Sequence, residues 1–305
     1  MPIKIPGGLP AAQTLESEHI FVMDESRAQT QDIRPLRIAI LNLMPTKIVT
    51  ETQLIRLLSN TPLQIELTLL GTETYRATHI SEEHMESFYQ SFSAVKDKKF
   101  DGLIITGAPV ENLEFSDVAY WDELCAILDW SRTHVYSTLH ICWAAQAGLY
   151  HHYGIQKYAL PKKMFGIFKH EVVVPRHPLL RGFDETFLAP HSRHTTVYEQ
   201  DIEDCPQLDI LARSDRAGVY IVADRNARQF YITGHAEYDY DTLSREYFRD
   251  TLRGLDIDIP YNYFPGNDTS KTPRNVWRGH AHLLFSNWLN YFVYQRTPYD
   301  INSIE

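Results

Sequence analysis

Cysteine is scarce in this chain, and no long hydrophobic run interrupts it. The 305 residues contain only Cys125, Cys142 and Cys205, an odd and sparse set that does not predict a disulfide framework. The opening MPIKIPGGLP lacks the apolar core of a secretory signal. No apolar run approaches the roughly 18 residues that a transmembrane helix needs. Together these absences predict a soluble protein of the reducing cytoplasm.

An excess of positive charge is also missing. Lysine and arginine number 29 against 39 aspartates and glutamates, which gives a formal net charge of −10 at pH 7. A chain of this sign binds phosphate backbones and anionic lipid poorly, so neither nucleic acid nor a membrane is an expected partner. A local basic pocket for one anionic ligand stays compatible with the overall charge.

The usual cofactor and metal signatures are absent as well. Neither a Walker glycine loop nor a dinucleotide-binding glycine pattern occurs, which argues against ATP and NAD. Several histidines occur in pairs, but none has the HExxH spacing or a neighbouring cysteine cluster: His151 and His152, His191 and His194, and His280 and His282. We therefore expect neither a cofactor nor a metal site.

The distribution of apolar residues predicts an α/β fold. Hydrophobic residues make up 44% of the chain and charged residues 22%, as in folded globular proteins. Residues 1–33 show little periodicity and are expected to form an N-terminal arm. After them, strand and helix patterns alternate, with strands at 34–44, 63–70, 100–106 and 135–141 and helices at 47–60, 81–95, 119–133 and 143–153. This alternation predicts a flavodoxin-like, doubly wound and mostly parallel sheet.

The second half of the chain changes character. Short strands with hairpin-like spacing are expected at 168–174, 209–213, 218–223 and 229–233, followed by helices at 240–252 and about 272–294. These strands are expected to extend the same sheet in antiparallel fashion. Although the length alone allows two domains at roughly 150 residues each, we expect residues 34–305 to form a single α/β domain with an embellished C-terminal half.

One cysteine occupies a position typical of a nucleophile. Cys142 directly follows a predicted buried strand and directly precedes a predicted helix. A residue at such a tight turn projects above the sheet, and the helix N-terminus favours a thiolate there. A small buried hydrophobic side chain is the competing interpretation. Cys125 lies within a predicted helix and Cys205 precedes a proline, so both are expected to be structural or incidental.

A base for such a nucleophile is available after the last predicted strand. His235 and Glu237 follow that strand two residues apart, a spacing that places both side chains on one face if the chain is extended. Alternatively, a turn after Gly234 folds one residue onto the other. A carboxylate beside an imidazole fixes its tautomer and stabilises the imidazolium. An isolated H-x-E is more often a surface pair, but its place at a strand end favours a catalytic role.

These features resemble two related groups of proteins. A cysteine at the turn and a later His-x-Glu resemble the class-I glutamine amidotransferase fold, although glycines do not flank the cysteine here as they do in those enzymes. The whole chain resembles the MetA-type homoserine O-acyltransferases, in the opening MPIKIPGGLPA and in NLMPTK (42–47), TGAPV (106–110), HICWAAQAGL (140–149), KMFGIF (163–168), PHSRH (190–194), GHAE (234–237) and PRNVW (273–277).

The resemblance implies a ping-pong acyl transfer in methionine biosynthesis, carried out by a homodimer. Cys142 would attack the thioester of an acyl-CoA, which serves as a co-substrate and not as a bound cofactor, and would hold the acyl group. His235, oriented by Glu237, would move the protons of the thiol and of the homoserine hydroxyl. Backbone amides at Cys142 and Trp143 and in the turn around Ala108 would form the oxyanion hole.

The resemblance also implies substrate contacts. Lys163, Ser192 and Arg249 carry over as residues that bind homoserine. Glu246 lies three residues before Arg249 on a predicted helix, so it can face the same site and take the substrate ammonium. Lys47 and the region of Arg193 are candidates for the CoA phosphates.

The acyl donor is expected to depend on Glu111, which follows the TGAPV turn. A glutamate at this position goes with acetyl transfer in the resemblance, because it would repel the terminal carboxylate of a succinyl group. Homoserine O-acetyltransferase activity is therefore the expectation. The alternatives are the same fold with succinyl-CoA as donor, a glutamine amidotransferase-like cysteine hydrolase, and a binding protein without catalysis.

Overall fold

The parallel half of the sheet consists of strands that are buried on both faces. The computed structural model describes residues 3–4, 9–17, 22–23, 34–74 and 81–304. Strands β4 (Ile65–Gly71), β3 (Leu36–Leu41), β6 (Phe100–Ile105), β7 (Val135–Ile141) and β12 (Gln229–Ile232) lie side by side in that order, all parallel. Most residues of these strands are buried, because helices cover both faces of such a sheet.

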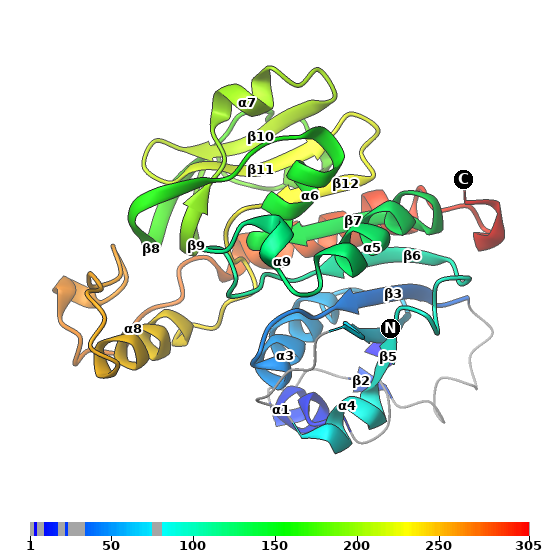
Figure 1. Cartoon of the computed structure of the whole chain (residues 1–305), viewed down its shortest axis with the longest axis horizontal. Coiled ribbons are helices and arrows are strands. Elements are labelled where there is room, and N and C mark those ends of the chain that lie inside the picture. Colours follow the sequence, from blue (N-terminus) through cyan, green and yellow to red (C-terminus); the bar gives the residue numbers. More distant parts are fainter. Residues whose placement is uncertain (1–2, 5–8, 18–21, 24–33, 75–80, 305) are drawn as a thin grey trace.

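Alternate residues of each strand enter different cores. Leu36, Ile38 and Ile40 of β3 pack with α3 (Lys47–Leu58) and α9 (Arg278–Asn287). Ala39 and Leu41 pack on the other face with α5 (Trp121–His134) and α6 (Trp143–Tyr153). Figure 1 shows α5 and α6 in front of the sheet and the C-terminal helix behind it. The result is the three-layer sandwich that the alternation of strands and helices predicts.

The sheet continues beyond β12 in antiparallel fashion, as predicted. Its further strands are β11 (Gly218–Asp224), β10 (Leu208–Ser214), β8 (Tyr158–Val172) and β9 (Thr186–Thr196), each antiparallel to the one before it. Two details differ from the prediction. Strand β8 begins ten residues earlier than expected, and β9 was not predicted, because its sequence TFLAPHSRHTT is polar where it lines the site. The short helix α7 (Glu199–Glu203) follows β9.

Two predicted helices have different bounds. The helix expected at 81–95 ends early, since α4 spans only Glu82–Phe88 and the chain then forms β5 (Tyr89–Ser91), which pairs with β4. The helix expected at about 272–294 begins later, at Arg278, because the side chain of Asn275 accepts hydrogen bonds from the backbone amides of Trp277 and Arg278. It passes into a π-helical segment, Trp288–Tyr294. Helix α8 spans Thr242–Leu252.

Part of the predicted N-terminal arm joins the edge of the sheet. Strand β1 (Ile3–Lys4) pairs with β4, and β2 (Val22–Met23) pairs with β1. Helix α1 (Ala11–Ser17) packs against α3 and buries Leu15. Leu9, just before this helix, is buried as well. Residues 1–2, 5–8, 18–21 and 24–33 of the arm lie outside the described part of the chain. None of the helices in the described ranges combines the length and the apolar composition that crossing a bilayer requires.

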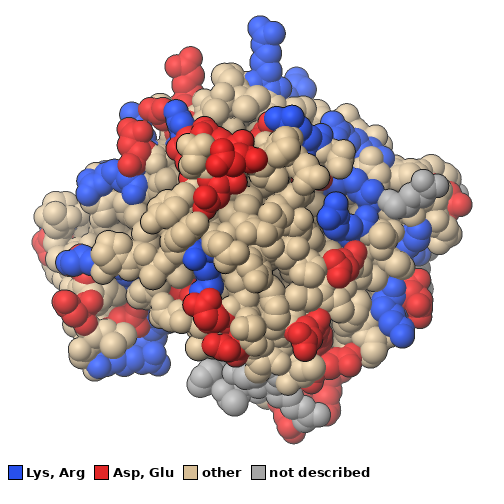
Figure 2. Space-filling view, turned by 45° about the horizontal axis from the view of Figure 1, so that its top comes forward, with Lys and Arg blue, Asp and Glu red and all other residues tan. Residues whose placement is uncertain are grey.

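Charged side chains are dispersed over the surface. Figure 2 shows basic and acidic residues side by side across the visible face, separated by uncharged surface. On this face, acidic side chains gather near the upper edge and basic ones along the upper right, with uncharged surface between them.

Candidate active site

Three neighbouring strands bring the predicted catalytic residues to one edge of the sheet. Strands β6, β7 and β12 are adjacent and parallel, so their carboxyl ends meet. Gly107 follows β6, Cys142 follows β7, and His235 follows β12. Ligands of open α/β sheets bind at this edge. The topology thus unites Cys142 with His235, which lies 93 positions later in the sequence.

Cys142 sits on a strained turn. Its backbone has φ 54° and ψ −115°, a conformation that L residues rarely adopt, and it directly precedes the first turn of α6. The side chain is buried, with 5% of the residue exposed. Because the turn connects a buried strand to a helix, it has the geometry of a nucleophile elbow.

The backbone amide of Cys142 takes part in the hydrogen bonding of the sheet. Its N–H donates to the carbonyl of Ile232 at 2.7 Å, which extends the pairing of β7 with β12. This group is therefore not available for an oxyanion hole, and that part of the sequence expectation is corrected. Trp143 occupies the first position of α6, where an amide has no intrahelical acceptor. Ala108, in the turn after β6, is buried.

His235 contacts both of its expected partners. Its Nδ1 atom lies 2.7 Å from Oε1 of Glu237, and its side chain also interacts with that of Cys142. The backbone amide of His235 donates to the carbonyl of Pro190 in β9, which fixes the segment that carries it. Burial alone would lower the pKa of His235, but the charges and hydrogen bonds of Cys142 and Glu237 raise it well above its usual value.

Gly107 makes the approach of these groups possible. A methyl group at this position would lie 3.2 Å from Cβ of Cys142 and 3.7 Å from Cε1 of His235. The turn after β6 therefore covers the cysteine–histidine pair at van der Waals distance, with no room for a side chain.

The predicted substrate residues form a second cluster. The Oγ atom of Ser192, in β9, donates to Oε2 of Glu246 at 2.5 Å, and Nζ of Lys163, in β8, lies 3.2 Å from the same oxygen. Nζ of Lys163 also lies 3.5 Å from Asp250, whose other oxygen accepts from Nε of Arg249 at 2.7 Å. Glu246, Arg249 and Asp250 all belong to α8. Two cations and two carboxylates thus alternate, a suitable setting for a zwitterionic ligand.

Sequence reasoning missed two members of this cluster. Asp250 follows Glu246 by four residues, so the i, i+4 spacing on α8 could have indicated it. Tyr238 stacks on His235, with ring centroids 4.1 Å apart and an interplanar angle of 17°, and its hydroxyl donates to Oε1 of Glu246 at 3.0 Å. No local sequence pattern indicates these two contacts, because one partner, Glu246, belongs to a different element, α8.

Glu111 is half-buried in the turn that follows β6. Nζ of Lys157 holds the backbone of this turn by donating to the carbonyls of Glu111 at 2.9 Å and Leu113 at 2.7 Å. The charges of Glu111 and Cys142 both act on Arg193, which lies in β9. Glu111 thus lies within electrostatic range of a group that also interacts with the candidate nucleophile.

Both basic residues expected near CoA phosphates point into the fold. The guanidinium of Arg193 is 1% exposed and donates to the carbonyls of Thr195 and Ala217. Burial lowers its pKa to about 10. Nζ of Lys47 donates to the carbonyl of Asn42 at 2.6 Å, and burial lowers its pKa to about 8, an effect that Glu51 partly opposes.

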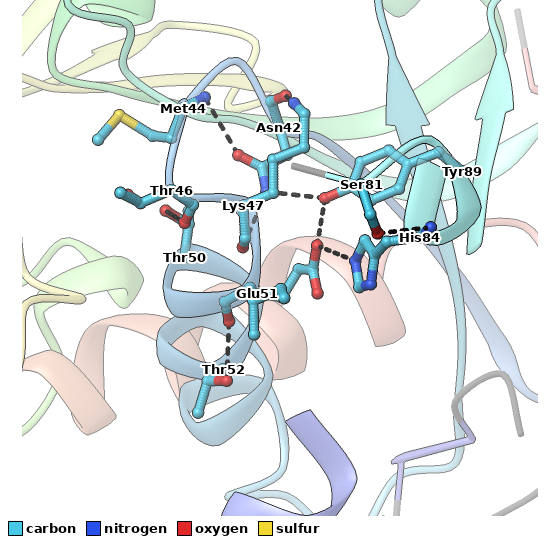
Figure 3. A network of polar contacts seen from close by, with 11 residues as sticks. Asn42, Met44, Thr46, Lys47, Thr50, Glu51, Thr52, Ser81, His84 and Tyr89 are labelled. Atoms are coloured by element: carbon cyan, nitrogen blue, oxygen red, sulfur yellow. Dashed lines mark hydrogen bonds and ion pairs between the residues drawn. The ribbon is translucent and has the colours of Figure 1, made fainter. Parts of the chain in front are cut away.

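Lys47 belongs to a buried polar network that joins α3 to β5 (Figure 3). Oε1 of Glu51 accepts from the hydroxyl of Tyr89 at 2.5 Å and lies 3.1 Å from Nε2 of His84. The hydroxyl of Tyr89 in turn accepts from the side-chain amide of Asn42. These contacts hold the loop after β3 against the sheet.

A cavity of about 730 Å³ lies beside the segment that carries Glu237 and Tyr238. Its charged lining is balanced, with Arg56, Arg245 and Arg278 against Glu237, Asp239 and Asp241. Arg56 pairs with Asp239 at 2.8 Å and Arg245 with Asp241 at 2.6 Å. Glu237 and Tyr238 line this cavity, whereas Cys142, Lys163 and Glu246 do not.

The last candidates from the sequence are the histidine pairs, as metal ligands, and the two other cysteines. Within the described ranges, no group of three or more His, Cys, Asp or Glu side chains is arranged to hold a metal ion. Cys125 and Cys205 are free thiols of intermediate exposure. Burial raises the pKa of Cys125 to about 11, and Asp129 and Asp122 add to that effect.

Comparison with known proteins identifies the family. The family model described as homoserine O-succinyltransferase matches residues 2–299. The chain belongs to this family. It is 61% identical over 305 residues to a homoserine O-acetyltransferase of Acetivibrio thermocellus, covering 100% of both chains, and 60% identical over 301 residues to one of Clostridium acetobutylicum, covering 99% of this chain and 100% of the relative. The chain is accordingly a homoserine O-acyltransferase, an enzyme of methionine biosynthesis with small-molecule substrates.

Solved structures confirm the predicted fold. A glutamine amidotransferase of Thermotoga maritima superposes with a TM-score of 0.53 at 11% identity, covering 84% of this chain and 98% of that one. An amidotransferase of Methylobacillus flagellatus gives 0.52 at 12% identity, covering 85% and 95%. At such low identity the likeness concerns the fold alone, which is class-I glutamine amidotransferase-like.

Proposed function

We propose that this family member transfers an acetyl group from acetyl-CoA to the hydroxyl of homoserine through a thioester on Cys142. The observation that carries the proposal is the buried Cys142–His235–Glu237 arrangement at the strained turn after β7. Relatives at about 60% identity that are named homoserine O-acetyltransferases support the choice of acetyl.

The first half-reaction acylates the enzyme. The Cys142 thiolate attacks the thioester carbonyl, a C–S bond forms, and the oxygen takes up negative charge. The amides of Trp143 and Ala108 are proposed to stabilise that oxyanion, each such donor being worth about 3 kcal/mol. The intermediate then breaks its bond to the CoA sulfur, and CoA leaves with the proton held by His235. Because one thioester replaces another, this step is close to thermoneutral.

The second half-reaction discharges the acetyl group. His235 removes the proton of the homoserine hydroxyl, whose oxygen attacks the Cys142 thioester, and the thiolate leaves. Glu237 holds His235 by its Nδ1 atom, so Nε2 faces the reacting atoms in both halves. One histidine thus serves both transfers in turn.

The cluster around α8 is proposed to bind homoserine. Arg249 is paired with Asp250 through Nε only, so its terminal nitrogens can take the substrate carboxylate as a fork. Glu246 would take the ammonium. Lys163 and Ser192, which both contact Glu246, hold that carboxylate in place.

The donor choice is assigned to Glu111. The family description names the succinyl reaction, whereas the relatives are named for the acetyl reaction. Succinyl-CoA carries an additional carboxylate, and a glutamate beside the acyl site repels it. We further propose that the enzyme is a cytoplasmic homodimer, an expectation to be tested by cell fractionation and by light scattering.

The test is product analysis with competing substrates. Purified protein is incubated with homoserine and an equal mixture of acetyl-CoA and succinyl-CoA, and the products are separated by mass. O-acetylhomoserine is expected to dominate, and O-succinylhomoserine as the main product would overturn the donor assignment. A parallel incubation with glutamine measures ammonia, and sustained release would favour an amidotransferase instead.

A further inference from the structure

Tyr238 connects the two clusters of the site. Its ring lies parallel to His235, with centroids 4.1 Å apart, and its hydroxyl donates to Oε1 of Glu246 at 3.0 Å. The backbone N–H of Tyr238 donates to the carbonyl of His235 at 3.3 Å, so the segment between them is a tight turn. One buried side chain therefore touches the acid–base residue with its face and the substrate cluster with its tip.

The ring of Tyr238 affects the charge state of His235, whereas its hydroxyl affects the orientation of Glu246. An aromatic face attracts a protonated imidazole through its electron-rich π system, so the stack favours the charged form of His235. The hydroxyl supplies a donor to a carboxylate that already accepts from Ser192 and Lys163. Glu246 then has both oxygens occupied before substrate arrives, which fixes its orientation.

Tyr238 is well placed for this double task. The residue is 7% exposed, and the aromatic ring of Trp277 donates to its backbone carbonyl at 3.1 Å. Burial raises the pKa of the Tyr238 hydroxyl well above its usual value, and Glu246 and Glu237 add to that effect, so the group remains a proton donor. The stack on His235 and the hydrogen bond to Glu246 are both present in the same side-chain conformation.

We infer that Tyr238 is a positioning residue with two separable roles: its ring positions His235 for both half-reactions, and its hydroxyl positions Glu246 for homoserine binding. The inference rests on the proposed function. It goes beyond it by assigning the two contacts of one side chain to different kinetic steps.

Two substitutions separate the roles. Tyr238→Phe keeps the ring and removes the hydroxyl, whereas Tyr238→Leu removes both. Acylation is measured as CoA released from acetyl-CoA without homoserine, across a range of pH. Discharge is measured as a function of homoserine concentration. Tyr240→Phe is the matched control, because Tyr240 lies two residues away with an exposed side chain.

The expected results differ between the variants. Tyr238→Phe releases CoA within twofold of the wild-type rate but raises KM for homoserine about tenfold, the effect of one lost hydrogen bond to a charged group. Tyr238→Leu also slows CoA release about tenfold, and its pH profile moves to lower pH because the imidazolium loses its aromatic partner. Tyr240→Phe changes neither quantity.

Other outcomes overturn the inference. If Tyr238→Phe slows CoA release as much as Tyr238→Leu, the roles are not separable. If Tyr238→Phe leaves KM for homoserine unchanged, its hydroxyl does not position Glu246. These results require a wild type that releases CoA and acetylates homoserine. A wild type that does neither would overturn the proposed function itself, which is a distinct result.

Discussion

Oε1 of Glu237 lies 2.7 Å from Nδ1 of His235, and both side chains are at least nine-tenths buried. A carboxylate in this position requires a proton on Nδ1 and leaves Nε2 to exchange protons with Cys142 and with substrate. Because the amide of a glutamine can donate to Nδ1, it permits the opposite tautomer. The tautomer of His235 is thus sensitive to the replacement of one carboxylate oxygen of Glu237 by an amide nitrogen.

Glu237→Gln is therefore expected to reduce kcat for acyl transfer by on the order of 10²- to 10⁴-fold, while the fold is retained. Single-turnover kinetics with acetyl-CoA measure the effect. Glu246→Gln serves as a contrast, since it should act mainly on KM for homoserine. A Glu237→Gln enzyme with kcat within a few-fold of the wild type would contradict the role of the carboxylate.

Glu111→Gly is expected to raise the use of succinyl-CoA relative to acetyl-CoA. Two unit charges 4 Å apart repel by about 4 kcal/mol at an effective dielectric constant near 20. Glu111 is half-buried, and a quarter of that energy, about 1 kcal/mol, still gives several-fold discrimination. The ratio of kcat/KM for the two donors is the measurement. An unchanged ratio would show that Glu111 does not select the donor.

Gly107→Ala is expected to slow acylation without unfolding the protein. The added methyl group would lie 3.2 Å from Cβ of Cys142, so the cysteine–histidine pair must shift by a few tenths of an ångström. Gly279→Ala is the matched control, because the added methyl group meets no described atom within 4 Å beyond its chain neighbours and the backbone of its own helix. Equal activity of the two variants would indicate that the turn after β6 does not confine the pair.

Stability is expected to fall as the pH drops below about 6.5. Nε2 atoms of His170 and His191 lie 2.9 Å apart in the core, and burial lowers the pKa of His170 to about 3 and that of His191 well below its usual value. Both are neutral in the folded protein. Below pH 6.5 the unfolded chain takes up protons that the folded one does not, so unfolding is favoured by about 1.4 kcal/mol per pH unit for each histidine.

Urea unfolding at pH 7.5, 6.5 and 5.5 checks this linkage. The free energy of unfolding should be nearly constant between the first two values and lower at the third. A free energy that does not change between pH 6.5 and 5.5 would show that the histidine pair already accepts a proton in the folded state.

The parallel strands could be predicted from the sequence, because a strand that is buried on both faces contains consecutive apolar residues, which can be recognised locally. Leu36–Leu41 is aliphatic except for Arg37, and β6 ends in the aliphatic run Leu103–Ile105, so their ends locate the loop after β3 and Gly107. The same reasoning found Cys142, since a strand and a helix meet there without a loop. His235 and Glu237 were recognised by their spacing at a strand end.

Other features depend on partners distant in sequence. Strand β9 contains Pro190, Ser192 and Arg193, polar or strand-breaking residues whose partners come from β8, α8 and the loop before β11. The segment after Phe88 leaves its helix because Tyr89 pairs with Leu69 and donates to Glu51. The stack of Tyr238 on His235 is likewise a tertiary contact, and no periodic pattern in the sequence indicates it.

The central claim is that Cys142 carries the acyl group between the two substrates. Intact-protein mass spectrometry after mixing with acetyl-CoA or succinyl-CoA, without homoserine and with Cys142→Ala as control, tests it most directly. An acetyl adduct is expected that is absent from the control and disappears when homoserine is added. An enzyme that acetylates homoserine but never shows an adduct, or whose adduct persists in Cys142→Ala, would contradict it.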